Sequence, residues 1–384
     1  MSKTSLKKYI ISISLWFSKI ISLTFIIFLM LEIFSSFAIK SLPNIAHMVY
    51  TRSLRNIERD SRESSPQYTD TSYSKIVFSD LTQYRERYNP YTVWISDKIG
   101  SRTLNIDERG VRKTYNPPVN KNTNKKIFIF GASTLFGLGT DDDHTIPSIL
   151  SKIINKNSKN RYEVINYGTL AYISSQELNR LIIELRRNNI PDYVIFYDGI
   201  ADILFGVYNP GFPGAHFHYY ETALSYNHHG FLNLIYSSYS LKLIGYTIER
   251  LYKRYQKSSI RDIDNKIARM LNNYKKNIEI VHALSKSYGF KYYIFFQPVL
   301  CAAKKPMTDY EKKIYDNSGV LNIIFRKAYD EIKKVDFKGY RYYNISDAFD
   351  KIDKDIYIDF AHVGAFGNEI IAETIYKHIK QDIY

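Results

Sequence analysis

Two stretches of the chain, far apart in sequence, carry side chains that together can catalyse acyl transfer. Ser133 follows the small residues Gly131 and Ala132, and Asp359 precedes His362 in Asp359-Phe360-Ala361-His362. A nucleophilic serine needs a tight turn at which its Oγ and its backbone N–H both face the substrate. A histidine base needs one ring nitrogen at the nucleophile and the other held by a carboxylate. These residues therefore predict a Ser-His-Asp triad, with Ser133 as nucleophile, His362 as base and Asp359 fixing the tautomer.

Each stretch also has a plain structural explanation when it is taken alone. Gly131-Ala132-Ser133 can be an ordinary turn after a strand, and a carboxylate three residues before a histidine can form a local cap. The order of the two stretches, and the elements that surround them, favour the catalytic interpretation.

The elements that must position these residues alternate between strands and helices from about residue 125 onward. Short apolar runs predict the strands, and stretches with helical periodicity predict the segments between them. The expected strands cover 126–130, 162–166, 193–197, 292–296 and 342–345, and the expected helices cover 145–154, 175–188, 264–288, 308–335 and 367–379. This alternation predicts an α/β fold with a doubly wound, mainly parallel sheet and active residues at the carboxyl ends of the strands.

On these residues the chain resembles the SGNH/GDSL hydrolases, from about residue 125 to the C-terminus. The matching blocks, in chain order, are Phe130-Gly131-Ala132-Ser133, Asn166-Tyr167-Gly168 followed by Ser174-Ser175-Gln176-Glu177-Leu178, Asp198-Gly199-Ile200-Ala201-Asp202, and Asp359-Phe360-Ala361-His362. The resemblance implies a flavodoxin-like three-layer sandwich with Ser133, His362 and Asp359 as the triad. It also implies that the backbone amides of Ser133 and Gly168 form the oxyanion hole.

The chain departs from the family pattern at two positions. Ala132 stands where many members have Asp, and Ala201 stands where the third block has an asparagine that donates to the oxyanion. Loss of one such donor typically costs ~3 kcal/mol, or a factor of ~10² to 10³ in rate. Either another donor replaces it, with Asn209 as a candidate, or the chemistry is slow, unusual or lost.

The resemblance implies a serine-dependent esterase or O-acyltransferase that works through an acyl-enzyme. By analogy with relatives that modify polysaccharides, the expected substrate is an acyl ester, with acetyl favoured, of a cell-envelope or surface glycan. A lipase or thioesterase acting near the membrane is the alternative within enzymes. A catalytically degenerate protein that binds or assembles glycans is the alternative outside them, and Ala201 supports it.

Other polar clusters have structural explanations, so we expect neither a metal nor a cofactor. The run 141–144, Asp-Asp-Asp-His, precedes an expected helix, where acidic residues suit the helix dipole. His216, His218, His228 and His229 lie in an aromatic stretch and lack the spacing of zinc ligands on a helix. This stretch, 205–236, is expected to form a wall or lid whose aromatic rings can stack on sugars. The single cysteine, Cys301, lies in an apolar run typical of a buried thiol and can form no intramolecular disulfide.

The net charge of +15 raises the question of nucleic acid. Positive residues are mixed with acidic ones, as in the run 52–63, which we interpret as a solvated surface. The sequence has no basic helix, zinc spacing or recognised nucleic-acid motif, so we expect no nucleic-acid partner. A diffuse attraction to anionic polymer or anionic lipid stays open.

The N-terminal segment predicts a membrane anchor. Residues 20–39 are apolar apart from Glu32, and a helix of this length crosses the ~30 Å hydrocarbon layer. Lys3, Lys7 and Lys8 favour a cytoplasmic N-terminus, which places the bulk of the chain outside the cytoplasm, at the periplasmic or extracellular face. A cleaved signal peptide is the alternative.

Three domains follow from these patterns. Residues 1–40 are the tail and single-pass anchor, and residues 125–384 are the SGNH-like domain with an insertion at about 205–262. Residues 41–124 are a stalk, expected over 41–75, and an appendage with short strand-like runs at 75–78 and 91–95. The expected partners are an acylated glycan or another ester and, through the anchor, membrane lipid.

Overall fold

The computed structural model describes residues 3–41, 60–118, 124–208, 214–219, 222, 238–240 and 262–383. The chain forms two compact units, one from Met1–Ser53 with Tyr220–Arg261 and the other from Leu54–Tyr219 with Asp262–Tyr384. The second unit holds every residue of the predicted triad.

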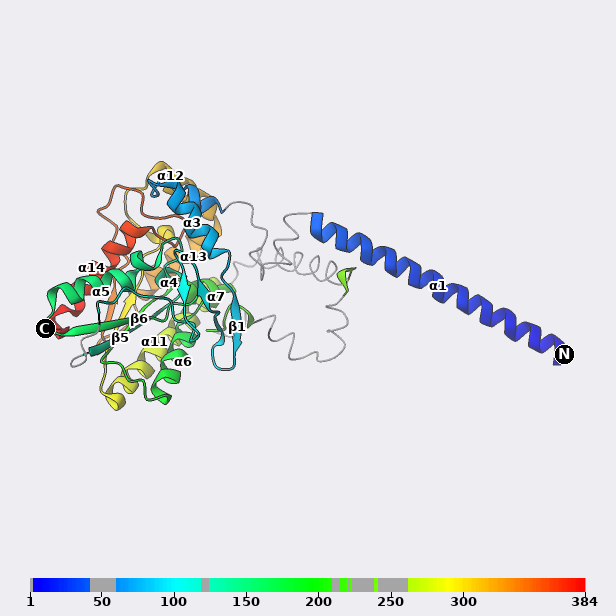
Figure 1. Ribbon diagram of the computed structural model, residues 1–384, viewed down its shortest axis with the longest axis horizontal. Helices are drawn as coiled ribbons and strands as arrows, with labels where there is room; N and C mark the ends of the chain where they lie inside the picture. The colour runs from blue at the N-terminus through cyan, green and yellow to red at the C-terminus, as the bar shows by residue number, and fades with distance from the viewer. Residues whose placement is uncertain are drawn as a thin grey trace. The chain divides into compact units, whose positions relative to one another are not determined.

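A five-stranded parallel sheet forms the centre of the second unit, as the sequence predicts (Figure 1). Its strands are β5 (Asn124–Gly131), β6 (Arg161–Asn166), β7 (Tyr193–Asp198), β8 (Lys291–Phe296) and β9 (Tyr342–Asn344). They lie in the order β6-β5-β7-β8-β9, which is the flavodoxin-like order. The chain therefore reverses its direction of winding at β5 and β7, and the crevice at the carboxyl ends of these strands is where ligands bind in such sheets.

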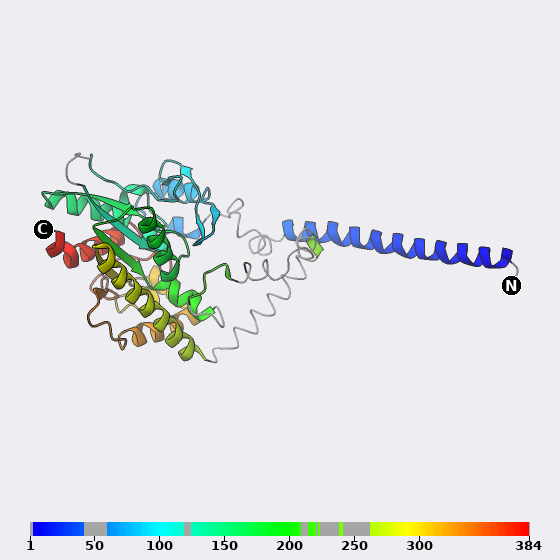
Figure 2. The ribbon, with the colours of Figure 1, turned by 90° about the horizontal axis from the view of Figure 1, so that it is seen from below.

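Alternation along the strands separates two hydrophobic layers. Phe128 and Phe130 face one layer, whereas Ile127 and Ile129 face the other, because successive side chains of a strand point to opposite faces. The first layer is covered by α6 (Ser174–Arg186), α7 (Ile200–Tyr208), α11 (Ile263–Tyr288) and α13 (Val320–Ile332). The second is covered by α5 (Ile146–Asn157) and α14 (Ala365–Ile383). Figure 2 shows the sheet between these layers, with α11 beside α6.

The predicted helices are present with one correction. Thr145 caps α5 as expected, its hydroxyl accepting the Ser148 amide at 3.3 Å. The predicted helix 308–335 is instead two helices, α12 (Asp309–Ser318) and α13, so the expectation of one continuous helix was wrong. Gly319 separates them with φ 52° and ψ −116°, a conformation that a residue with a side chain rarely adopts.

The N-terminal part of this unit is described from Asp60 onward. It contains the short 3₁₀ helix η2 (Ser61–Ser64), α3 (Thr71–Leu81), and the antiparallel pairs β1 (Glu86–Asn89) with β2 (Val93–Ser96) and β3 (Ile99–Gly100) with β4 (Asn105–Ile106). The expected stalk 41–75 is thus wrong from Asp60 onward. The expected strand 75–78 is also wrong, because it lies within α3. Asp70 caps that helix by accepting the Ser72 amide, and Val77 and Phe78 are buried on its inner side.

The first unit contains α1 (Lys3–Ser41), whose residues Trp16–Phe37 are long and apolar enough to cross a membrane. A signal sequence has the same length and composition, so these features alone do not separate an anchor from one. That span holds two charged residues, Lys19 and Glu32. Glu32 accepts hydrogen bonds from the hydroxyls of Ser238 and Ser240 and from the Tyr239 amide at 2.7 Å. These partners satisfy a carboxylate that would be costly alone in lipid.

Candidate active site

The nucleophile position follows the carboxyl end of β5, at the crevice that the strand order defines. Ser133 is the first residue of the short helix α4 (Ser133–Phe136). Gly131 precedes it where the chain passes close to β7, and a Cβ there would lie 2.5 Å from the Tyr197 carbonyl oxygen. Gly131 is therefore required by close backbone approach to β7, a reason different from the exposed serine that the sequence suggested.

Asp359 and His362 lie on a tight turn between β9 and α14. The Asp359 Oδ1 atom accepts the backbone amides of Ala361 at 2.9 Å and His362 at 2.7 Å. The Ile358 amide donates to the His362 carbonyl at 2.9 Å, which closes the base of the turn. The turn brings the carboxylate and the imidazole of the same segment face to face.

The structure brings the three predicted side chains into one hydrogen-bonded chain. The His362 Nε2 atom lies 2.7 Å from Ser133 Oγ, and His362 Nδ1 lies 2.8 Å from Asp359 Oδ2. A proton on Nδ1 leaves Nε2 free to accept the serine proton, which is the tautomer that a general base requires. The geometry suits nucleophilic catalysis, and the catalytic roles themselves stay predictions.

The charge on Asp359 results from opposing effects. Burial by itself raises the pKa of this carboxyl, but His362, the Arg62 guanidinium and backbone amides outweigh burial and hold the pKa well below its usual range. The carboxylate therefore stays ionised through the neutral range, as an orienting group for the imidazole must.

Arg62 is a contact of the triad that the sequence did not indicate. Its NH1 atom donates to Asp359 Oδ2 at 3.1 Å, while its other nitrogens bind Asp60. The run 52–63 was interpreted as a solvated surface, and this was wrong for Asp60, Arg62 and the buried Glu63. An alternating charge pattern gives no signal for a partner that lies 297 residues away.

Of the two predicted oxyanion amides, those of Ser133 and Gly168, the Gly168 amide already has a hydrogen-bond partner. The Gly168 amide donates to the Asn166 side-chain oxygen at 2.9 Å. Gly168 also packs so closely on α4 that a Cβ there would lie 2.5 Å from the Phe136 nitrogen. For Gly168 to bind an oxyanion, its amide has to exchange the Asn166 oxygen for the substrate oxygen.

Both departures from the family pattern meet in one apolar cluster. Ala132 and Ala201 pack with Ile173 and the half-buried Phe205, and Ala201 is 6% exposed. Ala201, at the position of the third-block donor, thus contributes a methyl group to the same apolar cluster as Ala132, the residue before Ser133. Asn209, the candidate replacement donor, lies outside the described residues.

A second arginine supports the loop after the nucleophile. Arg112 is buried and pairs with Asp142, its Nε lying 2.9 Å from Oδ1. Its remaining nitrogens donate to the carbonyls of Phe136 at 2.7 Å and Thr140 at 2.7 Å. Asp142 is therefore the partner of a buried cation. Its neighbour Asp141 accepts the His144 amide at 3.0 Å and caps a 3₁₀ turn, η3 (Asp142–His144).

Aromatic rings extend from the apolar cluster toward the surface. The Phe205 ring lies 5.1 Å from that of Phe217, and the Phe217 ring lies 4.8 Å from that of His218. His218 in turn lies 4.9 Å from Trp94 of β2, and Phe217 is 50% exposed. These four side chains, the aromatic ledge, come from the predicted wall and from the appendage. His228 and His229 lie outside the described residues.

A buried acidic cluster lies under the third block. Glu177, Asp198 and Asp202 are all buried; Tyr274 donates to Asp198, and Ser174 Oγ donates to Asp202 at 2.6 Å. Burial, and then the neighbouring carboxylates, raise the pKa of Glu177 and of Asp198 well above the usual range. Burial likewise raises the pKa of Asp202 to about 6. The cluster therefore retains protons at mildly acidic pH.

Cys301 is buried, as the sequence predicts, in η4 (Leu300–Ala302). Burial raises the pKa of this thiol to about 11, so it is neutral and unreactive at neutral pH.

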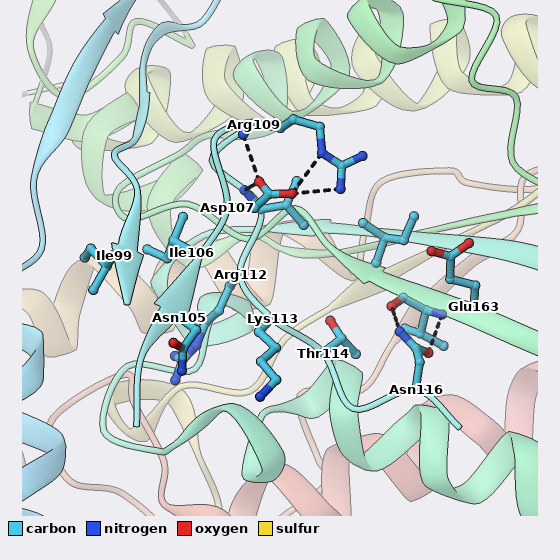
Figure 3. Close-up of a pocket in the computed structure, with 13 residues that line it drawn as sticks. Ile99, Asn105, Ile106, Asp107, Arg109, Arg112, Lys113, Thr114, Asn116 and Glu163 are labelled. Atoms are coloured by element: carbon cyan, nitrogen blue, oxygen red, sulfur yellow. Dashed lines mark hydrogen bonds and ion pairs between the residues drawn. The ribbon is translucent and has the colours of Figure 1, made fainter. Parts of the chain in front are cut away.

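A hollow of about 400 Å³ lies away from the triad, along the edge strand β6 (Figure 3). Asn116 spans one end of it, donating to the Val164 carbonyl at 2.8 Å and accepting the Val164 amide at 2.9 Å. The lining comes from β3, β4, the segment after β4, and β6, and it does not include the triad. This hollow is a seam between the appendage and the sheet edge.

Comparison with known proteins gives a likeness of fold. No protein-family model and no curated protein matches the sequence. Similar solved structures include a putative lipolytic protein of the G-D-S-L family from Desulfitobacterium hafniense (11% identity, TM-score 0.32, 66% of this chain and 99% of that one). They also include an acetylxylan esterase from Geobacillus stearothermophilus (14%, 0.33, 67% and 94%) and the esterase EstA from a Pseudoalteromonas species (14%, 0.36, 67% and 98%). The structural neighbours are thus SGNH/GDSL-type esterases at low identity.

Proposed function

We propose that this protein is a serine esterase or O-acyltransferase that forms an acyl-enzyme on Ser133. The observation that carries the proposal is the hydrogen-bonded chain of the triad, with 2.7 Å between Ser133 Oγ and His362 Nε2 and 2.8 Å between His362 Nδ1 and Asp359 Oδ2. A histidine held by a carboxylate on one side and by a serine hydroxyl on the other is the arrangement that activates a serine.

The reaction proceeds in two steps. Ser133 Oγ attacks the ester carbonyl while His362 Nε2 takes the serine proton, and the Ser133 and Gly168 amides stabilise the tetrahedral oxyanion. The intermediate collapses, the ester C–O bond breaks, and His362 gives its proton to the leaving alcohol. Water, or a sugar hydroxyl, then loses a proton to His362 and attacks the carbonyl of the acyl-enzyme. The bond between Ser133 Oγ and the acyl carbon breaks, and His362 returns its proton to Ser133 Oγ.

The oxyanion hole has features that should limit kcat. Ala201 supplies no side-chain donor, and the loss of one donor costs ~10² to 10³ in rate. The Gly168 amide must also leave Asn166 before it can bind the oxyanion. We therefore expect a slower enzyme than one with three free donors.

An acetylated glycan of the cell envelope is the substrate that we propose. The methyl groups of Ala132 and Ala201 next to Ser133 suit a short acyl chain, and the exposed Phe217 ring of the aromatic ledge suits a sugar face. The apolar helix α1 would keep the enzyme at a membrane. The small residues Ala132 and Ala201 disfavour a lipase or thioesterase. The preferred length of the acyl chain is the property that distinguishes such an enzyme from the one proposed.

The test is hydrolysis of p-nitrophenyl esters by the full chain in detergent. Wild type is compared with Ser133→Ala and His362→Ala, and with Ser79→Ala, an exposed serine of α3, as control. We expect turnover of the acetyl ester to disappear in the first two variants and to persist in the control. Equal turnover by wild type and both triad variants would end the proposal. A preference for long acyl chains would favour the lipase, and transfer to an added oligosaccharide would favour the transferase.

A second candidate is a glycan-binding protein without catalysis. The engaged Gly168 amide and the Ala201 methyl group favour it, because together they leave a weak oxyanion hole. An alkyl fluorophosphonate labels an activated serine, and the adduct is located by mass spectrometry. Retention on an acetylated polysaccharide without labelling at Ser133 would favour binding alone.

A further inference from the structure

Arg62 is held in place by groups other than the triad. Its Nε donates to Asp60 Oδ1 at 3.0 Å and its NH2 to Asp60 Oδ2 at 2.7 Å, a two-pronged contact that fixes a planar guanidinium. The guanidinium carbon also lies 5.6 Å from the centre of the Phe78 ring of α3. The side chain is therefore oriented by the appendage, and NH1 is left to reach Asp359.

NH1 contacts the carboxylate oxygen that faces the imidazole most closely. Asp359 Oδ1 is held by the amides of Ala361 and His362, whereas Oδ2 lies 2.8 Å from His362 Nδ1 and 3.1 Å from Arg62 NH1. The terminal torsion of an aspartate side chain is broad and roughly two-fold, so contacts with other groups are needed to fix the orientation of its two oxygens. Backbone amides hold one oxygen, and Arg62 holds the other.

Arg62 and His362 are the charged groups in hydrogen-bond contact with Asp359, and Arg62 is itself paired with Asp60. The other titratable groups around it are Tyr68, Tyr310 of α12 and Cys301 of η4. Burial raises the pKa of each of these three groups, so they remain neutral across the range of an esterase assay. The charge state of the triad is thus set by one carboxylate, one histidine and the Arg62–Asp60 pair.

We propose that Arg62 is a positioning residue for the triad, contributed by the segment between the N-terminal helix and the catalytic fold. This inference rests on the proposed function. Arg62 fixes the second oxygen of Asp359 toward His362 Nδ1, and its positive charge offsets part of the carboxylate charge. The guanidinium therefore weakens the attraction between the Asp359 carboxylate and a positively charged imidazole.

The two parts of this role predict different results for two substitutions. Arg62→Gln removes both the positive charge and the planar guanidinium that contacts Asp60 and Asp359 together. We expect kcat/KM to fall by up to about 10²-fold and the acid limb of its pH profile to move to higher pH. Arg62→Lys keeps a charge but cannot span Asp60 and Asp359 together, so kcat falls while the acid limb stays near that of wild type. KM for a neutral ester changes little in either variant, because Arg62 does not bind the substrate.

The experiment measures kcat, KM and the pH profile of the full chain in detergent with p-nitrophenyl acetate. The matched control is Arg87→Gln, which breaks an exposed ion pair with Asp97 in the same appendage. Asp60→Asn should lower kcat/KM as Arg62→Gln does, because the guanidinium loses the carboxylate that orients it. The double variant should lose less than the sum of the singles. Added guanidinium should partly restore Arg62→Ala.

A second measurement does not depend on turnover. The low-field proton resonance of His362 Nδ1, identified by its loss in His362→Ala, should shift in Arg62→Gln and stay in place in Arg87→Gln.

An unchanged resonance together with a wild-type acid limb would overturn the positioning role. A lowered melting temperature with no guanidinium rescue would indicate a merely structural arginine, and a raised KM confined to anionic esters would indicate substrate binding. Activity that survives Ser133→Ala would instead remove the proposed function itself.

Discussion

Carboxyl groups that lie away from bulk solvent in this protein take opposite charge states according to their neighbours. The Asp359 side chain is 22% exposed, whereas Asp198 and Asp202 are buried. Asp359 has a guanidinium and two backbone amides within hydrogen-bond distance and stays ionised. Asp198 and Asp202 share their burial with Glu177, and their side-chain partners are the neutral hydroxyls of Tyr274 and Ser174. Repulsion and burial therefore favour the protonated form in this cluster, whereas hydrogen bonds and opposite charge favour the ionised form at the triad.

Asp359 makes the folded state sensitive to acid. Its pKa is lower in the folded than in the unfolded chain, so its contribution to stability is present above the unfolded value of about 4 and is lost as pH falls through the folded value. We expect the melting temperature of wild type to fall more steeply below about pH 5 than that of Asp359→Asn. The control is Asp264→Asn, whose side chain is 77% exposed. Parallel melting curves for wild type and Asp359→Asn would contradict this expectation.

The buried acidic cluster has the opposite pH dependence. The folded pKa of Asp202 is raised to about 6, so stability is fully present below the unfolded value and is lost as pH rises through the folded one. Glu177→Gln removes one ionisable member, and we expect it to gain about 1–3 kcal/mol over wild type between about pH 5 and pH 8. Denaturant unfolding of wild type and variant at about pH 5 and about pH 8 gives the difference in the free energy of unfolding. Glu108→Gln, 81% exposed, should show none.

At the scale of elements, the appendage is part of the site. Segments before β5 supply Arg62 to the triad, Arg112 to the loop after Ser133, and Trp94 to the aromatic ledge. Gln67, between η2 and α3, accepts the Gly364 amide at 2.9 Å just after His362. The catalytic fold therefore extends to residues before the sheet begins.

Arg112 should carry much of the stability of this junction. Arg112→Ala leaves Asp142 buried without its cation and frees the carbonyls that Arg112 binds, at a cost of about 3–5 kcal/mol. Denaturant unfolding of the full chain in detergent measures the loss. Arg87→Ala on the exposed side of the appendage should stay within about 0.5 kcal/mol of wild type. An Arg112→Ala variant as stable as that control would refute the junction role.

At the scale of the whole molecule, the N-terminal helix is the feature that bears on location. Trp16–Phe37 has the length and composition of a membrane span. The lysines at 3, 7 and 8 favour a cytoplasmic N-terminus, which would put the catalytic unit on the other side of the membrane.

A reporter fusion tests this topology. Alkaline phosphatase, which is active only after export, should be active when fused after Tyr384 and inactive when fused before Met1. Alkaline extraction should leave the chain in the membrane, and its mass should be that of the uncleaved protein. A chain shortened at its N-terminus and released by extraction would show that the segment is a signal peptide.

The predictable part of this protein depended on short-range patterns. The strands of the parallel sheet are apolar runs of a few residues, so β5 to β8 were evident from composition and alternation alone. Asp359 and His362 lie on one turn, so their contact followed from their spacing. The exceptions at short range were Gly319 inside a helical pattern and the run 75–78, where the Asp70 cap and one-sided burial favoured a helix over a strand.

By itself the sequence determined the fold class, the order of the blocks and the residue types able to perform acyl transfer. Only the tertiary structure decided that Ser133 lies 2.7 Å from His362, 229 residues away, and that Arg62 holds Asp359, 297 residues away. The physical reason is range. Propensity, capping and periodicity act over a few residues, whereas these contacts join segments that meet only after the sheet and its helices have packed.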